Sequence, residues 1–124
     1  MAGTITNPMV FRHASLPGVE VYAQGEIPTR GQPQEVLVRV EPNGIIRPHS
    51  HESDARMFVV NGSGTVLSED PETNNTEVTV GHCVFFEKQK EHGFQAGPNG
   101  LSFVSTNDGI VDGKQEWDIN LLPS

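Results

Sequence analysis

Two histidines, His49 and His51, are separated by a single residue in the stretch Pro48-His49-Ser50-His51. Side chains two positions apart on an extended strand point to the same face, so the two imidazoles can converge on one point. Imidazoles at this spacing suit a divalent transition metal. A distant histidine, His92, is the apparent third partner. Two surface histidines in a polar turn would show the same spacing, so the pair by itself leaves both interpretations open.

The composition indicates which elements position these histidines. With 124 residues the chain is long enough for one domain with a buried core. Its 13 Gly and 9 Pro favour many turns and few long helices. No helical periodicity persists for three turns, whereas short alternating segments recur between turn signals. The pattern predicts an all-β sandwich or barrel.

The expected strands are short segments, most of which alternate apolar and polar residues. They are residues 19–23, 35–41, 56–60, 65–68, 77–80, 83–86, 93–96, 101–106 and 117–122. Residues 61–64, Asn-Gly-Ser-Gly, are expected to form the turn of a hairpin, and residues 42–44, Pro-Asn-Gly, a second turn. Residues 1–18 and 25–34 are expected to be irregular, and residues 69–76 to form an exposed acidic loop.

The charge of the chain excludes several classes of partner. There are 16 Asp and Glu against 8 Lys and Arg, for a net charge of −8. Nucleic acids and anionic membranes are therefore not expected to bind, because both require clustered basic residues. No apolar run approaches the ~20 residues of a membrane-spanning helix, and residues 1–18 lack the core of a signal peptide. The single cysteine, Cys83, fits a reducing compartment and is expected to behave as a small core hydrophobe, so a cytoplasmic protein is expected.

Two segments resemble the paired motifs of the cupin family. In the first, Gly44, the His49-Ser50-His51 pair and Gly62 follow the family order of Gly, His-x-His and Gly. In the second, residues 81–94 match a glycine, an apolar strand and a final histidine, His92. The resemblance covers residues 35–106.

The resemblance implies one cupin-like domain over residues 1–124. Its fold would be a double-stranded β-helix, a jelly-roll barrel, with a conserved core over residues 35–106 and an irregular N-terminal arm over residues 1–18. It also implies a homodimer, with the strand around residues 19–23 as the segment expected to cross between protomers.

The first motif departs from the family pattern at its glutamate ligand. Counted back from Gly62, that position falls on Ala55, or on Arg56 with a longer spacer. Neither side chain can bind a metal. Three-histidine cupins without the glutamate are a recognised variation, as in the cysteine dioxygenases and the β-diketone-cleaving dioxygenases.

The resemblance therefore implies a metal centre made of His49, His51 and His92. Fe(II) is the favoured ion, and Zn, Ni, Mn or Cu would also suit three imidazoles. Asp54 is a possible further ligand, whereas strand parity opposes Glu52.

The second motif carries His82, Glu87 and Gln89 in place of the family's Asp, Pro and Gly. These changes affect a turn and remove no ligand. His82 is expected to be a surface or turn residue, and His13 is given no role.

Strand parity also predicts which side chains line the interior. The expected pocket-lining residues are Ala55, Met57, Val59, Phe94 and Val38, with Val36 and Val40 on the same wall as Val38. All of them would be core positions in any β-barrel. Arg47 and Arg56 are expected to be solvated, with the guidance of an anion as the alternative.

Three functions are compatible with such a site. The first is an oxygenase-type enzyme, dioxygenase-like, acting on a small chelating organic molecule. An anionic substrate is favoured because replacing the family glutamate with Ala55 makes the site one charge more positive. The alternatives are a metal-assisted isomerase, cyclase or lyase, and a non-enzymatic small-ligand-binding domain. No catalytic residue is identified, and the candidate general bases beyond the ligands are Tyr22, Glu52 and Asp54.

Overall fold

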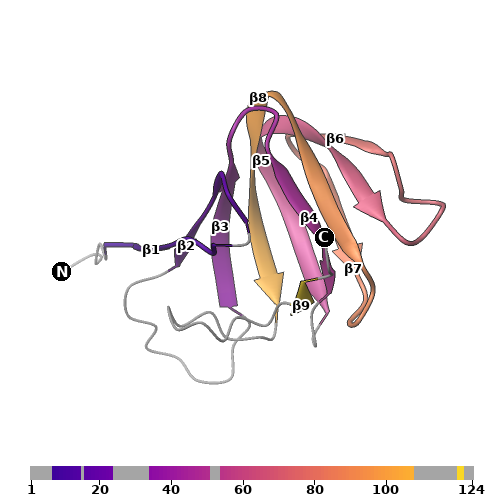
Figure 1. Cartoon of the computed structure of the whole chain (residues 1–124), viewed down its shortest axis with the longest axis horizontal. Helices are drawn as coiled ribbons and strands as arrows, with labels where there is room; N and C mark the ends of the chain where they lie inside the picture. The colour runs from indigo at the N-terminus through magenta and orange to yellow at the C-terminus, as the bar shows by residue number, and fades with distance from the viewer. Residues whose placement is uncertain (1–6, 15, 24–33, 51–53, 108–119, 122–124) are drawn as a thin grey trace.

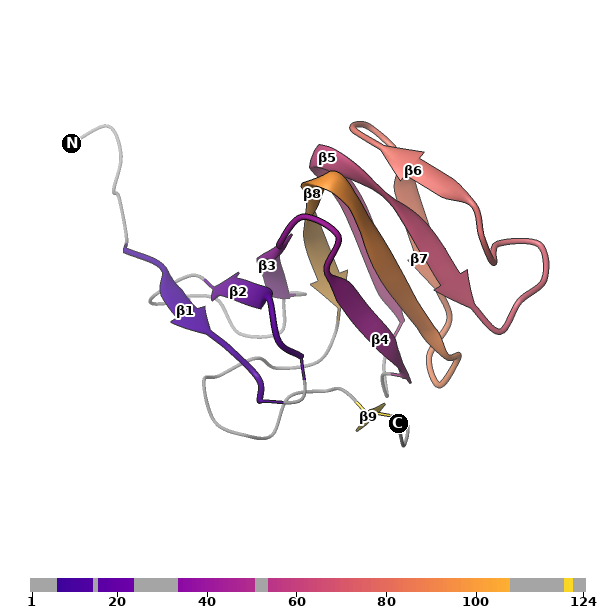
Figure 2. The same ribbon diagram turned by 45° about the horizontal axis from the view of Figure 1, so that its top comes forward.

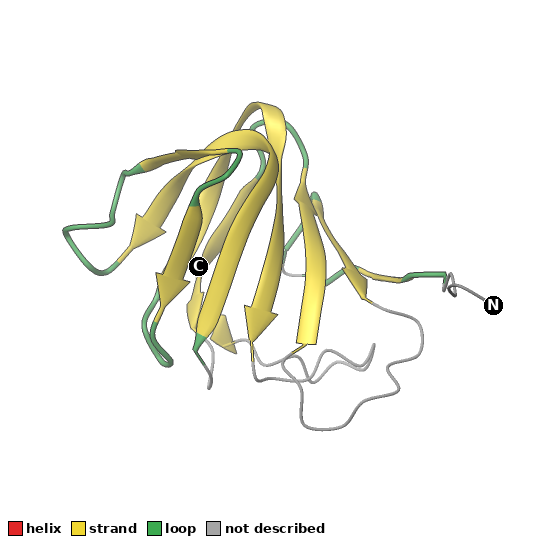
Figure 3. Ribbon diagram, turned by 180° about the vertical axis from the view of Figure 1, so that it is seen from behind, coloured by secondary structure: helices red, strands yellow, loops and turns green. Residues whose placement is uncertain are grey.

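A computed structural model of the chain describes residues 7–14, 16–23, 34–50, 54–107 and 120–121. These residues form nine strands, and no helix occurs among them (Figure 3). The strands are β1 (Met9–Phe11), β2 (Val19–Ala23), β3 (Gln34–Val40), β4 (Ile45–Ser50), β5 (Ala55–Ser68), β6 (Glu77–Thr79), β7 (Cys83–Phe86), β8 (His92–Asn107) and β9 (Asn120–Leu121). The all-β prediction is confirmed. In the described ranges there is likewise no helix long and apolar enough to cross a membrane.

Two long antiparallel strands, β5 and β8, run side by side through the molecule and carry the other strands (Figure 1). The C-terminal half of β8 pairs with β3, which continues to β2 and β1, whereas its N-terminal half pairs with β4 and, through it, β9. The N-terminal half of β5 pairs with β7 and its C-terminal half with β6. Figure 2 shows β1 to β3 on one side of the molecule and β6 and β7 on the other. All pairings are antiparallel, and the jelly-roll prediction is confirmed.

The predicted hairpin at residues 61–64 is wrong, because β5 continues through it as one strand. β8 follows β5 around a bend, with register shifts between Val59 and Asn61 and between Gly62 and Gly64. Gly62 has a φ of 75°, and a Cβ there would lie 2.1 Å from the carbonyl oxygen of Gly100. Turn-forming residues here bend two paired strands around a corner. The two strands expected at residues 93–96 and 101–106 are likewise a single strand, β8.

Other expectations are confirmed or corrected locally. Asn43 has a φ of 60° in the expected turn, and residues 69–76 form largely exposed turns. Residues 1–18 are not wholly irregular, because Met9–Phe11 forms β1 against β2. Cys83 is exposed and is not a core residue, because β7 turns Phe86 inward and Cys83 outward. Residues 25–33 lie outside the described residues, as does most of the strand expected at 117–122.

The core lies inside the bent sheet, between the side with β1 to β3 and the side with β6 and β7. It is built from the inward-facing residues of the strands. β2 alternates buried and half-buried positions along its length, and Val36, Val38 and Val40 of β3 are all buried. This alternation is what one apolar face of each strand produces. Only three polar side chains among the described residues are buried with this core: His49, His92 and Ser105.

Candidate metal centre

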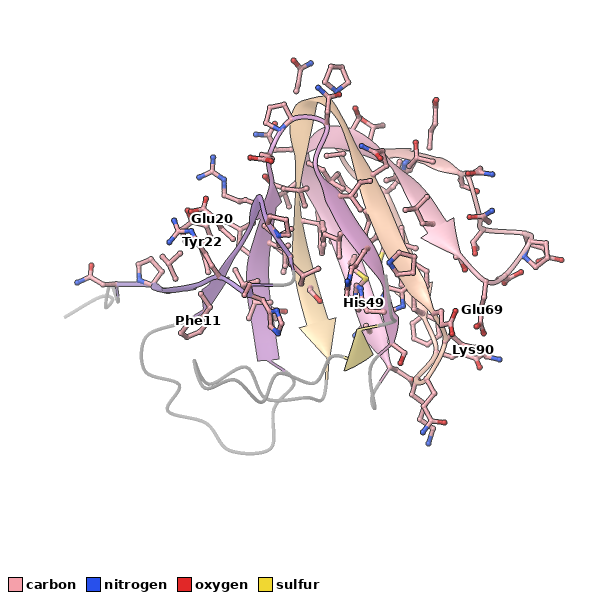
Figure 4. All side chains as sticks on the ribbon, in the orientation of Figure 1. Phe11, Glu20, Tyr22, His49, Glu69 and Lys90 are labelled. Carbon is pink, nitrogen blue, oxygen red and sulfur yellow. The ribbon has the colours of Figure 1, made fainter. Side chains whose placement is uncertain are left out.

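His49 and His92 meet inside the barrel, from strands far apart in the sequence. His49 lies near the end of β4 and His92 opens β8, and the two are register partners in the β4–β8 ladder. Their ring centroids lie 4.6 Å apart with a 59° angle between the rings. The exposed fractions are 4% for His49 and 1% for His92, so both rings are buried in the core. Figure 4 shows the His49 side chain among the strands. Two of the three predicted ligands are therefore neighbours.

A bulge in β4 turns His49 inward. Ile46 pairs with Phe94 and His49 pairs with His92, so β4 advances by three residues over the same distance in which β8 advances by two. Without this extra residue, Ile46 and His49 would lie on opposite faces of the strand. Both are buried. Pro48, inside the bulge, has no N–H to give to a ladder, and this is the sequence signal that marks the irregularity.

A glycine next to His92 lets the two strands come close. A Cβ at Gly93 would lie 2.3 Å from the carbonyl oxygen of Ile46 and 3.1 Å from the backbone nitrogen of Pro48. No side chain fits at that distance. The close approach of β8 to the bulge of β4 therefore depends on glycine at this position.

Each histidine is held in one tautomer by the backbone of its own strand. The Nδ1 atom of His49 lies 2.8 Å from the carbonyl oxygen of Arg47, and that of His92 lies 2.9 Å from the carbonyl oxygen of Lys90. A carbonyl only accepts, so Nδ1–H donates in both cases and Nε2 carries the lone pair. Metal-bound histidines are commonly oriented by such a bond from the second ring nitrogen. Both rings therefore fit the role of metal ligand through Nε2.

Phe86 packs directly on His92, a contact that strand parity in the sequence did not reveal. The rings are stacked with centroids 4.0 Å apart and an interplanar angle of 5°. Phe94 meets Phe86 edge-on at 6.1 Å. Since Phe85 and Phe86 are adjacent aromatics, only the register of β7 shows which one faces inward. Phe86 fixes the plane of the His92 ring.

The expected wall residues are all buried. Ala55, Met57, Val59, Phe94 and Val38 belong to one contiguous apolar cluster. Ala55 is the register partner of Phe86, which places it beside the aromatic ring that covers His92. The small side chain at the family's glutamate position thus belongs to the strand pair that borders the histidines. Arg56, one residue later, is exposed on the opposite face.

The other candidates differ in how the structure places them. His51 and Glu52 lie outside the described residues. Asp54 is exposed, and its Oδ1 accepts a hydrogen bond from the backbone N–H of Lys88 at 2.9 Å. His82 is exposed as predicted, and its Nδ1 accepts from the N–H of Thr79 at 3.0 Å. No group of three or more His, Cys, Asp or Glu side chains within the described ranges is arranged to hold a metal, and the predicted third ligand is His51.

A cavity of about 470 Å³ borders Phe86 at the β7–β8 turn. Its lining is mostly polar: Ser68, Glu69, Asp70, Thr73, Phe85, Phe86, Glu87 and Lys90. Lys90 Nζ and Glu69 Oε1 lie 3.7 Å apart beside it (Figure 4). Phe86 is both a wall of this cavity and the ring stacked on His92, but neither His49 nor His92 is among the residues that line the cavity.

Comparison with known proteins agrees with this architecture. A family model described as a cupin domain matches residues 36–105. A search of curated protein sequences gives no match.

Several solved structures share the fold. The polyketide cyclase RemF from Streptomyces resistomycificus is 22% identical with a TM-score of 0.72, and the alignment covers 100% of this chain and 88% of that one. KdgF from Halomonas sp. is 22% identical with a TM-score of 0.61, covering 74% of this chain and 82% of that one. A variant of oxalate decarboxylase from Bacillus subtilis is 23% identical with a TM-score of 0.68 over 96% of this chain, which spans 33% of that longer enzyme.

Proposed function

Because the chain belongs to the cupin domain family, we propose that its interior binds one divalent transition-metal ion through His49, His51 and His92 and uses it on a small organic substrate. The observation that carries the proposal is the buried His49–His92 pair, in which both Nδ1 atoms donate to backbone carbonyls and Nε2 is therefore the nitrogen that carries the lone pair. His51, two residues after His49, supplies the third imidazole.

Fe(II) is the ion this site is proposed to hold, with Zn, Ni, Mn and Cu as the other candidates. The donor set is all imidazole, which suits each of these ions, so availability and geometry decide among them. One of the oxalate decarboxylase structures with a similar fold is described for its Mn(II) centers. This supports a metal in the barrel without selecting the element.

When bound, the ion would supply Lewis acidity and, if it is iron, access to dioxygen chemistry. The protein's own contribution is position, charge and exclusion of water. Three neutral imidazoles leave the charge of the ion uncompensated, and Ala55 occupies the position where the family carries a glutamate. An anionic substrate that binds through two atoms, such as an enolate or a thiolate, would restore the balance. The surrounding apolar core keeps the local dielectric low and strengthens this attraction.

An oxygenase-type reaction is the form of this function that the interior favours. Apart from the two histidines, Ser105 is the only polar side chain buried in the described residues. Asp54 is exposed, and the hydroxyl of Tyr22 lies on the outer face, 3.3 Å from Glu20 Oε1. Neither Asp54 nor Tyr22 is placed in the interior as a general base, and this supports a reaction carried by the metal and its co-substrate; Glu52, the third candidate base, lies outside the described residues.

A metal-assisted cyclase, isomerase or lyase is the second candidate. The likeness to the polyketide cyclase RemF extends over the whole chain and favours it. A small-ligand-binding domain without catalytic activity is the third candidate function of the same site.

Oxygen uptake distinguishes the candidates. The protein would be purified, its metal content measured, and the apo form reloaded anaerobically with Fe(II) before an enolisable β-diketone or a small thiol is added. Uptake that depends on both iron and substrate supports the oxygenase. Turnover of a substrate by the zinc or nickel form without uptake would establish the non-redox alternative, and tight ligand binding with no turnover the binding domain. His92→Ala is the control that should abolish uptake.

A further inference from the structure

A second cavity lies on the outer face of the sheet, where β2, β3, β8 and β5 run side by side. Its volume is about 470 Å³, which is within the range of small-molecule sites. A polar row crosses the four strands in register along this cavity, from Glu20 through Arg39 and Ser102 to Asn61. The turns beside the row complete the lining with Gly18, Glu41, Pro42, Asn99 and Gly100.

Arg39 is a charged donor of this cavity that its nearest acid does not use. Its register partner Glu20 has one carboxylate oxygen paired with Arg12, and the other accepts a hydrogen bond from the Tyr22 hydroxyl at 3.3 Å (Figure 4). The guanidinium carbon of Arg39 lies 5.9 Å from the centroid of the Tyr22 ring, and this cation–π contact orients the group. Arg39 forms no ion pair with any carboxylate of the described residues. Its planar N–H fork can therefore accept a carboxylate from a ligand.

Glu41 is the acid that complements Arg39 in the same cavity. It lies two residues further along the chain, just after β3, so the two Cα atoms are about 7 Å apart on one face. Its carboxylate lies against the backbone of Gly18, where φ is 77° and a Cβ would lie 2.5 Å from Oε1. Within the described ranges Glu41, like Arg39, forms no ion pair. The cavity thus presents one cation and one anion that are separate from each other.

These charges favour a zwitterion over a simple anion as the ligand. Two arginines and two glutamates line the cavity, so its formal charge is zero, whereas the chain carries −8. A phosphate ester or a dicarboxylate would meet both glutamates and the field of an acidic chain. A ligand with a carboxylate for Arg39 and an ammonium group for Glu41 matches the two charges one for one.

The other polar side chains of the cavity are uncharged. Ser102, Asn61 and Asn99 can each donate and accept, and no described residue forms a hydrogen bond with their side chains. Gly100 turns the chain beside them with a φ of 83°, and a Cβ there would lie 3.0 Å from the carbonyl oxygen of Val40. A larger residue would therefore crowd this edge of the cavity. A hydroxyl or amide group on the ligand suits this surface.

We propose that this cavity binds a small zwitterion, an α-amino acid with a polar uncharged side chain. Its carboxylate pairs with Arg39, its ammonium group pairs with Glu41, and its side chain meets Ser102 and the two asparagines. The inference is independent of the metal centre, because neither His49 nor His92 lines this cavity.

The test is isothermal titration of the full-length protein with L-glutamine. We expect one site per chain. L-Glutaminamide lacks the carboxylate and N-acetyl-L-glutamine lacks the ammonium group, and each should bind at least about tenfold more weakly, as expected for the loss of a charged hydrogen bond. Arg39→Gln and Glu41→Gln should each weaken L-glutamine binding to the same degree. Arg56→Gln and Glu35→Gln are the matched controls, because both side chains are exposed and lie outside the cavity. They should leave the affinity unchanged.

The two variants also assign each contact separately. In Arg39→Gln the difference between L-glutamine and L-glutaminamide should disappear while N-acetylation still weakens binding, and Glu41→Gln should show the reverse. Circular dichroism should be unchanged in both proteins. Failure of every common α-amino acid to bind at millimolar concentration would overturn the proposal. So would equal affinity for L-glutamine and its N-acetyl derivative, or binding that survives both substitutions at full strength.

Discussion

At the scale of single residues, the histidine pair is organised by its own backbone. His49 and His92 each donate from Nδ1 to the carbonyl two residues earlier, to Arg47 and Lys90. The two strands thus repeat one local device, which selects the tautomer and the direction of Nε2 before any ion arrives. Ordering the ligands in advance lowers the entropic cost of binding.

The stack of Phe86 on His92 should strengthen metal binding, in addition to the stability that Phe86 contributes as a core residue. Phe86→Leu removes the ring that fixes the plane of His92, and we expect about tenfold weaker metal binding, in the range found for groups that orient metal ligands. Titration with Zn²⁺, and the ring nitrogen chemical shifts of His92, would measure the effect. Phe85→Leu is the control, because Phe85 is adjacent in sequence but exposed. Equal losses in the two variants would show that the stack has no role at the site.

Ala55→Glu tests whether the family's glutamate position faces the ion. The new carboxylate should act as a fourth ligand, so metal should be retained longer during dialysis against a chelator while substrate-dependent activity falls. Without metal the variant should be less stable than wild type, since a buried carboxylate would have no partner. Arg56→Glu, on the exposed face one residue later, should change neither property. An Ala55→Glu protein with unchanged retention and full activity would remove Ala55 from the site.

At the scale of strands, the alternation of residues predicted most segments, but not how they join. Residues 61–64 look like a hairpin turn because a bend in a paired strand uses the same glycines and asparagine as a reversal. Local composition cannot separate the two cases, since the choice depends on β8 running alongside β5. The β4 bulge was missed because parity counting assumes an unbroken ladder, although Pro48 marks the break.

The spacing between β4 and β8 can be tested with two glycines. Gly93→Ala should push β8 from the Ile46 carbonyl, separate His49 from His92 and weaken metal binding at least tenfold. Gly62→Ala is matched to it, because its Cβ would meet the Gly100 carbonyl oxygen at 2.1 Å, away from the histidines. It should lower the free energy of unfolding by about 1–3 kcal/mol through backbone strain. Calorimetry measures the loss of stability, and metal titration of the folded proteins measures binding. Metal binding that is weaker in Gly62→Ala but unchanged in Gly93→Ala would contradict the dependence of the site on the spacing between β4 and β8.

At the scale of the whole molecule, the fold and the apolar interior were predictable from the sequence, whereas the outer surface was not. Most of the described inward-facing residues are apolar in the sequence as in the structure, for example Val36, Val38 and Val40. The outer face brings together exposed apolar side chains from different strands, such as Val10 on β1 and Phe58 on β5, and their arrangement depends on how the strands pair.

Metal binding should stabilise the entire domain, because His49 on β4 and His92 on β8 lie far apart in the sequence and the ion would link the two strands. At 100 times the dissociation constant, a ligand that binds only the folded state adds about 2.7 kcal/mol. For a domain of this size the melting temperature should rise by about 10 °C. Differential scanning fluorimetry with and without Zn²⁺ would measure the rise, a chelator should reverse it, and His49→Ala should show none. A rise that persists in His49→Ala would assign the ion to another site.

Of the five histidines in the chain, His49, His51 and His92 are the three proposed to hold one metal ion. The most direct test of this assignment is the metal content per chain of five proteins, each with one histidine replaced by Ala, after equal loading and dialysis. His13→Ala and His82→Ala should retain about one equivalent, like wild type, and the other three should retain little while keeping the β spectrum of the fold. A His82→Ala protein that loses the metal, beside a His92→Ala protein that keeps it, would contradict the assignment.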